Sequence, residues 1–291
     1  MISPYVRRRR LAAELRHMRE EHGYSAHRLA DQIGVARQTI SRLENGHVSP
    51  DEHVVMKILR LFDVDQKQWN QLTTIAQEAR ERGWWAPYAH QMGRQALYAD
   101  LEAGAVEIRE YHLNLLPGLL QIPPYAEARL HAGREASSGE LDPARVLQAR
   151  AGRQQMLERP GGPAYEAILD ETAVRRHAAP PDVVGQQLDH LIHIGHYRDN
   201  VTIRVLPTAA MISGHLPRSA FFCYRYPPDD PRVVAVDTIT DDLVLTSIDK
   251  PGEVDSYLDL YEHLRATALS PADSLDFLIT LTEQLAHQPG R

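Results

Sequence analysis

Apolar side chains recur every three or four residues through the first 82 residues, and short polar stretches interrupt them. This spacing predicts amphipathic helices, because residues three and four apart share one face of a helix. A first helix is expected over residues 6–22, ending at Gly23, and a later one begins after Asp51, which suits an N-cap. With a last helix over residues 66–82, we expect a compact helical domain over residues 1–82.

The segment from Ser25 to Asn45 predicts two short helices joined by a tight turn. Ala30 is small where a second helix has to cross, and Gly34 tolerates the positive φ that such a turn requires. Ile40 and Leu43 then place apolar atoms on the inward side of the second helix, residues 36–45.

The outward side of that second helix is polar and has no carboxylate on its leading turn. The residues on this side are Ala36, Arg37, Gln38, Thr39, Ser41, Arg42 and Asn45. A helix of this length spans about 15 Å and fits the major groove of B-DNA, roughly 12 Å wide. Arg pairs twice with guanine and Gln with adenine, so we favour base recognition over a merely solvated polar face.

Beyond residue 93, β-rich runs alternate with helical patterns and with clusters of Pro, Asp and Gly. The β-rich runs cover residues 106–116, 165–169, 201–206, 221–226, 233–238 and 243–248. Helical patterns cover residues 95–103, 123–133, 143–158, 182–197, 253–269 and 272–286. The predicted fold class is therefore α+β, an all-α N-terminal bundle followed by a mixed α+β domain over residues 94–291.

Residues 83–93, GWWAPYAHQMG, break the periodicity and mark the boundary between the two domains. Flexible linkers seldom contain two adjacent tryptophans, since Trp is highly buried on average. We expect Trp84 and Trp85 to belong to a packed connector that docks against the second domain.

Charge is distributed unevenly along the chain. Residues 1–82 hold 14 Lys and Arg against 11 Asp and Glu, a net charge of +3. The whole chain has a net charge of −7, so residues 83–291 have a net charge of −10. A basic N-terminal domain, here called the head (residues 1–82), on an otherwise acidic protein indicates nucleic acid as its partner. Arg8, Arg9 and Arg10 lie in a run of four arginines, for which we favour phosphate contacts over a solvated helix start.

The composition also indicates in which cellular compartment the protein is expected. The lone Cys223 excludes an internal disulfide, in agreement with a reducing cytoplasm, and its apolar setting predicts a buried thiol. No apolar run approaches the roughly 18 residues that span a bilayer, and no secretory signal begins the chain. We expect a cytoplasmic protein.

Candidate enzymatic groups in the second domain are weak, and we predict no enzyme, cofactor or metal site. His190, His193 and His196 recur every three residues, a spacing that drifts around a helix and favours a polar face over a metal site. Asp170 and Glu171 precede an apparent helix, where its dipole explains them. A self-cleaving Ser–Lys pair would need Lys250 with Ser213 or Ser247, and Lys250 is expected to be solvated.

The motif GVARQTISRLENG, residues 34–46, resembles the lambda-repressor-like (Cro/C1-type) helix-turn-helix family. The resemblance implies base contacts from Arg37 and Gln38, and base or backbone contacts from Arg42 and Asn45. It also implies a phosphate contact at Ser25, the cap of the preceding helix.

The same resemblance implies two further features of the head. Ala26 departs from the family, which often has Gln there, so one phosphate contact is not carried over. Arg19 and Glu44 match a partly buried ion pair that ties the first helix to the recognition helix, a structural role.

Motifs of the second domain, such as LLPGLLQIPPYA, ARAGRQQML, AILDETAVRR and LRATALSPADSL, resemble an uncharacterised domain of actinobacterial regulators. That domain follows a Cro/C1-type head in proteins described as antitoxin-like transcriptional regulators, often encoded beside a small partner protein. Two departures are His177-Ala178-Ala179 in place of a glycine-rich turn, and Asp237 where Glu is usual.

Together these observations predict a sequence-specific DNA-binding transcriptional regulator. Heads of this type usually act in pairs on double-stranded DNA, so a homodimer is expected. The α+β domain would dimerise, bind a partner or sense a ligand. The alternative is an antitoxin-like interaction module that neutralises a small partner protein, with DNA binding secondary.

Overall fold

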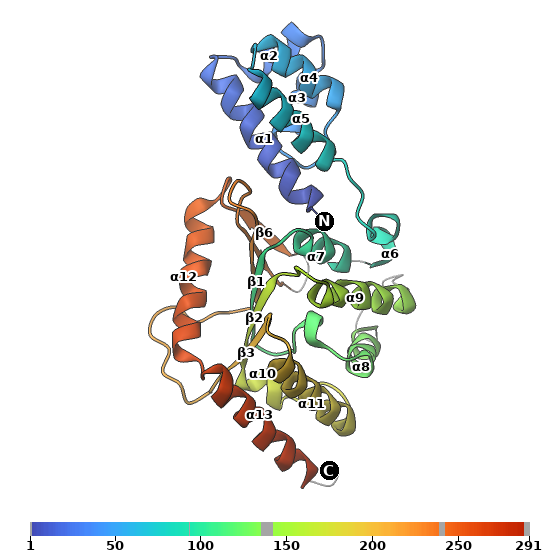
Figure 1. Cartoon of the computed structure of the whole chain (residues 1–291), viewed down its shortest axis with the longest axis vertical. Helices are drawn as coiled ribbons and strands as arrows, with labels where there is room; N and C mark the ends of the chain where they lie inside the picture. Colours follow the sequence, from blue (N-terminus) through green and yellow to red (C-terminus); the bar gives the residue numbers. More distant parts are fainter. Residues whose placement is uncertain (1, 93, 135–141, 239–241, 288–291) are drawn as a thin grey trace. The chain divides into compact units, whose positions relative to one another are not determined.

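The computed structural model describes residues 2–92, 94–134, 142–238 and 242–287, and its fold is α+β, as predicted (Figure 1). The chain divides into two compact units. The first comprises Met1–Pro87 together with two short segments, Tyr98–Ala105 and Tyr226–Pro231. The second comprises the remainder of the chain. We predicted one boundary, at residues 83–93, whereas in the structure two later segments of the chain also belong to the first unit.

The first unit is built on helices, two of which begin after the N-caps expected from the sequence, Ser25 and Asp51. The first helix begins two residues before its expected start, because Ser3 caps it. The helices are α1 Pro4–Glu21, α2 Ala26–Ile33, α3 Arg37–Glu44, α4 Glu52–Leu61 and α5 Gln66–Glu78. The side chains of Ser3, Ser25, Asp51 and Asp65 each accept a backbone N–H at a helix start. α5 ends four residues before the predicted Arg82, because Arg80 and Glu81 donate to carbonyls three residues back, at Gln77 and Glu78.

Apolar side chains of all five helices form one core. Among its fully buried members are Leu29, Ile40, Val55 and Leu59, and Leu15 of α1 is 1% exposed. The helical periodicity of the sequence thus converts directly into one buried face per helix.

The tryptophans after α5 have different environments. Trp85 is buried, whereas Trp84 remains 38% exposed, and the two rings meet edge to face. Trp85 is therefore packed, as expected, but both tryptophans belong to the first unit, whereas we expected them to dock against the second domain. Gly93, the last residue of the expected connector, lies outside the described residues.

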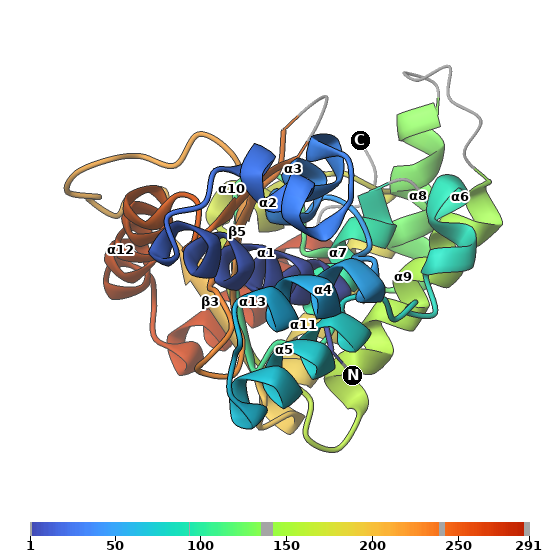
Figure 2. The ribbon, with the colours of Figure 1, turned by 90° about the horizontal axis from the view of Figure 1, so that it is seen from above.

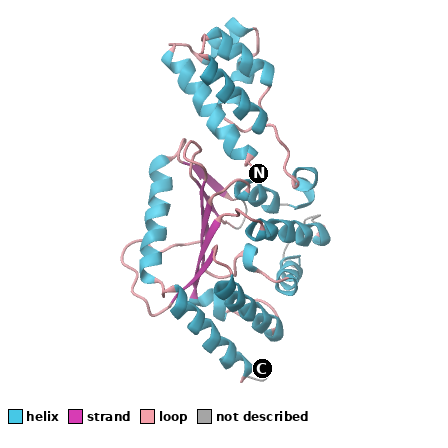
Figure 3. Cartoon of the chain, viewed as in Figure 1, coloured by secondary structure: helices cyan, strands magenta, loops and turns pink. Residues whose placement is uncertain are grey.

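The described strands of the second unit form one six-stranded mixed sheet in the order β3-β2-β1-β4-β5-β6. Figure 3 shows this sheet nearly edge-on, with helices on either side. Their bounds are β1 Glu107–His112, β2 Ala164–Asp170, β3 Val201–Leu206, β4 Phe221–Arg225, β5 Val233–Val236 and β6 Leu243–Thr246. β1, β2 and β3 pair in parallel, and β4, β5 and β6 continue the sheet antiparallel from β1. β1 ends at His112, four residues short of the predicted run.

Helices cover both faces of this sheet. α12, Pro251–Thr267, lies along one face, and its Val254, Tyr261 and Leu264 pack on residues of the strands. The helices on the opposite side are α8 Pro123–Arg134, α9 Pro143–Glu158 and α11 Pro181–Tyr197, a separation visible in Figures 1 and 2. α13, Pro271–Ala286, packs against α11 and β3.

The remaining short elements are divided between the two units. They are the 3₁₀ turns Ala86–Tyr88 and Gly118–Leu120 and the helices α6 Ala89–Met92, α7 Arg94–Glu102 and α10 Glu171–Arg175. Asp170 caps α10 by accepting the Thr172 N–H, and Glu171 pairs with Arg175. Both carboxylates thus have structural partners at this helix start.

Cys223 lies on β4 and is buried, which confirms the predicted core thiol. Burial raises the pKa of Cys223 to about 12, so the reactive thiolate is scarce at pH 8. We expect negligible reaction of the native chain with a chromogenic disulfide reagent at pH 8, and one thiol per chain after unfolding in guanidinium. Rapid stoichiometric labelling of native protein would contradict this burial.

Candidate nucleic-acid interface

The turn between α2 and α3 depends on Gly34. Its φ of 69° lies in the left-handed region, and its N–H caps α2 by donating to the carbonyls of Ala30 and Asp31. A Cβ at this glycine would meet nothing within 4 Å. The requirement for glycine is therefore the backbone conformation rather than space.

α3 has one buried and one exposed side. Ile40 is fully buried and Leu43 is 5% exposed, so both belong to the core. The exposed residues are Ala36, Arg37, Gln38, Ser41, Arg42 and Asn45, whereas Thr39 is half-buried. The structure thus places six of the seven predicted recognition residues in solvent.

Three polar side chains on the exposed side of α3 have no partner in the described part of the chain. Within the described residues, the side chains of Arg37, Gln38 and Arg42 have no hydrogen bond or ion pair to other residues. Ala36, the N-cap, provides no side-chain oxygen to the helix. This surface therefore offers two guanidinium groups and an amide to an external acceptor.

α3 contains one carboxylate, Glu44, and Arg19 of α1 binds it. Arg19 Nε donates to Glu44 Oε1 over 2.7 Å, and Arg19 Nη2 donates to Glu44 Oε2 over 3.0 Å. Its Nη1 also donates to the carbonyl of Tyr24. Hydrogen bonding to Glu44 raises the pKa of Arg19, with burial acting in the opposite direction. The pair neutralises the carboxylate that would otherwise repel phosphate.

Two other arginines of α1 hold the end of α3. Arg9 Nη1 donates to the carbonyl of Asn45 over 2.8 Å, and Arg16 Nη2 donates to the carbonyl of Glu44. Cations at a helix C-terminus satisfy its open carbonyls and oppose the negative end of its dipole. Sequence reasoning missed Arg16, although residues 9, 16 and 19 share one face of α1 by their spacing.

The remaining arginines of the run also make contacts inside the first unit. Arg10 is buried, and its Nη1 lies 3.2 Å from Asp230. Arg8 Nη2 lies 3.6 Å from Asp100, and its Nη1 donates to the carbonyl of Ala79. Arg10 is buried and paired, and Arg8 is half-buried and paired, so this geometry does not favour either as a phosphate ligand.

Ser25 precedes α2 and remains exposed. Its hydroxyl accepts the Arg28 N–H over 3.1 Å. The first turn of α2 has no carboxylate, so its exposed N-terminus retains the positive end of the helix dipole. Ser25 therefore stays a candidate phosphate contact.

The candidate chemical groups of the second unit have structural contacts or lie apart. In the described part of the chain, no group of three or more His, Cys, Asp or Glu is arranged to hold a metal ion. Lys250 is exposed and its Nζ donates to Glu253 over 2.8 Å, a hydrogen bond that raises the pKa of Lys250. Ser247 accepts the backbone N–H of Arg232. A lysine with a raised pKa is a poor general base.

The tight turn between α2 and α3 and the exposed side of α3 have the geometry of a helix-turn-helix. The family model described as Helix-turn-helix matches residues 15–65. This match supports a DNA-binding regulator in general. The model described as Domain of unknown function (DUF5753) matches residues 95–280, more than half of the chain. The chain belongs to that family.

Other comparisons add nothing to this assignment. No curated protein and no solved structure matches the chain. Within the described residues, none of the helices has both the length and the apolar character needed to cross a bilayer.

Proposed function

We propose that this chain is a sequence-specific transcriptional regulator that recognises a DNA operator with α3. The observation that carries the proposal is the exposed pair Arg37 and Gln38, whose side chains have no partner in the described residues. Arg suits guanine O6 and N7, and Gln suits adenine N6 and N7. Arg42, Asn45 and Ser25 would contact bases or the DNA backbone beside them.

The number of base pairs that a specific operator requires also favours a homodimer. One recognition helix contacts too few base pairs for genomic specificity, and paired heads reach half-sites about 34 Å apart. The acidic second unit would carry the dimer contact, a partner site or a ligand site. In this proposal the protein works in the cytoplasm, where its DNA is.

An antitoxin-like role is the second candidate, in which the second unit neutralises a small partner protein. The observation that favours it is charge: residues 83–291 carry −10, which would attract a basic partner. DNA binding would then be secondary to this interaction.

Footprinting of the full chain on DNA upstream of its own reading frame separates these candidates. We expect two protected half-sites about one helical turn apart, or about 34 Å. Diffuse protection that vanishes with added salt would contradict the operator proposal and favour partner binding.

The phosphate contacts can be tested through the salt dependence of DNA affinity. Replacing Arg42 by Gln is expected to reduce the slope of log K against log salt by about 0.9 per protomer, one phosphate contact. Arg10→Gln is the matched control and should leave the slope unchanged, because Arg10 is already paired with Asp230. Equal reductions in both variants would show that Arg10 contacts DNA after all.

A further inference from the structure

A pocket of about 600 Å³ lies in the second unit between α12 and the loop of residues 207–220 that joins β3 to β4. Figures 1 and 2 both show this loop curving beside α12. Ligand sites for small molecules occupy roughly 300–1,000 Å³ and are mostly apolar, with a few polar groups. The volume is therefore that of a site for one small molecule.

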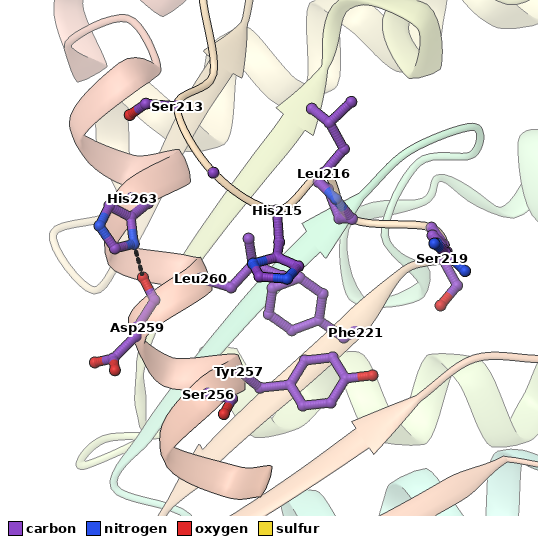
Figure 4. Close-up of a pocket in the computed structure, with 13 residues that line it drawn as sticks. Ser213, His215, Leu216, Ser219, Phe221, Ser256, Tyr257, Asp259, Leu260 and His263 are labelled. Carbon is purple, nitrogen blue, oxygen red and sulfur yellow. Dashed lines mark hydrogen bonds between the residues drawn. The ribbon is translucent and has the colours of Figure 1, made fainter. Parts of the chain in front are cut away.

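The base of the pocket is apolar and comes from two elements. Phe221 of β4 is 1% exposed, and Tyr257 and Leu260 of α12 are half-buried beside it. His215, from the loop, lines the same pocket, and in the view of Figure 4 its ring is drawn in front of Phe221 and Leu260. Aromatic and aliphatic groups thus surround a space suited to a flat apolar ring.

The rim holds an apolar side chain that the protein leaves uncovered. Leu216 lines the pocket and is 65% exposed. Covering an exposed leucine is favourable in proportion to the apolar area removed from water. An apolar ligand in this pocket would provide that cover.

The charge of the lining favours an acidic group on the ligand. Arg218 is exposed at the pocket, and no carboxylate among the described residues pairs with it. The carboxylate of Asp259 points away from His215 and Phe221 in Figure 4, and its backbone carbonyl accepts the Nδ1–H of His263 over 2.8 Å. Ser219, next to Arg218, adds a hydroxyl donor to the same end of the lining.

We infer that this pocket binds a small aromatic molecule that carries one acidic group. The ring would lie among Phe221, Leu260 and Tyr257, and the acid would pair with Arg218. A guanidinium recognises a carboxylate through charge-assisted hydrogen bonds. This inference does not depend on DNA binding, so its failure would leave the proposed function untouched.

Isothermal titration calorimetry on the full chain tests the inference with two probes of the same shape, 1-naphthoate and 1-naphthalenemethanol. We expect saturable one-to-one binding of the acid, with the neutral alcohol about tenfold weaker, since one charge-assisted hydrogen bond is worth about a factor of ten or more. Arg218→Gln should bring the affinity for the acid down to that for the alcohol and leave the alcohol unchanged.

Two exposed apolar residues of the loop provide a matched pair of variants. Leu216 lines the pocket, whereas Met211, 91% exposed, does not. Leu216→Asp should weaken 1-naphthoate at least tenfold, because it places a carboxylate at the mouth of the site, and Met211→Asp should have no effect. Equal effects of the two variants, or no binding of either probe at millimolar concentration, would overturn the inference.

Discussion

Replacing Arg37 and Gln38 together by alanine is expected to abolish operator-specific binding while weak, salt-sensitive binding persists. Each bidentate pair with a base contributes about 1–3 kcal/mol of discrimination, so the loss is about 2–6 kcal/mol per recognition helix. This corresponds to about 30-fold or more in affinity for the operator. Arg37→Ala alone should cost about 1–3 kcal/mol and relax the preference at one base pair. Competition footprinting with operator and random DNA measures both effects.

The matched control is another exposed cation beside an exposed amide, at the start of a different helix. Lys67 and Gln68 occupy such positions on α5. Lys67→Ala/Gln68→Ala should leave the footprint intact, and circular dichroism should show that both double variants fold. A footprint that survives loss of Arg37 and Gln38 would exclude α3 as the recognition helix.

Replacing Arg19 by alanine is expected to destabilise the first unit by about 3–5 kcal/mol, because Glu44 would be left buried without its cation. The side chains of Arg19 and Glu44 are only 12% and 8% exposed. The loss should be largest around α3, since Glu44 ends that helix. Urea unfolding gives the overall change, and hydrogen exchange of the α3 amides locates it.

A double variant separates the stranded charge from the lost contact. Replacing a buried ion pair by apolar residues of similar volume is often neutral, so Arg19→Met/Glu44→Leu should recover much of the stability lost in Arg19→Ala. If the double variant were less stable than Arg19→Ala, the ion pair itself would be the source of the stability.

The head was largely predictable because its contacts are local in sequence. α3 was expected over residues 36–45 and spans Arg37–Glu44, and its buried Ile40 and Leu43 follow from the apolar spacing alone. The strand at Val201–Leu206 was also placed correctly from its β-rich composition. Strand order was not predicted, because pairing joins distant segments such as β1 and β4 and periodicity carries no information about partners.

The arginine run shows the same limit at the candidate site. Four adjacent arginines indicate positive charge, but they do not indicate where each guanidinium points. Arg10 pairs with Asp230, 220 residues away in the sequence, and Arg9 satisfies a carbonyl at the end of α3. Such long-range partners decide whether an arginine is available to DNA, and they require the fold. The pocket beside α12 likewise depends on a loop whose course the sequence does not specify.

Ala36 is an N-cap residue that does not stabilise its helix through a side-chain hydrogen bond. An N-cap alanine leaves the helix without a side-chain acceptor, and Ser or Asp at such a position is commonly worth about 0.5–2 kcal/mol. A selection for heat resistance alone would favour those substitutions. In the proposed DNA complex an Asp carboxylate here would face the phosphates of the duplex, so its negative charge would lower the affinity for DNA. If α3 binds an operator as proposed, selection for heat resistance would favour Asp at position 36 and selection for DNA affinity would oppose it.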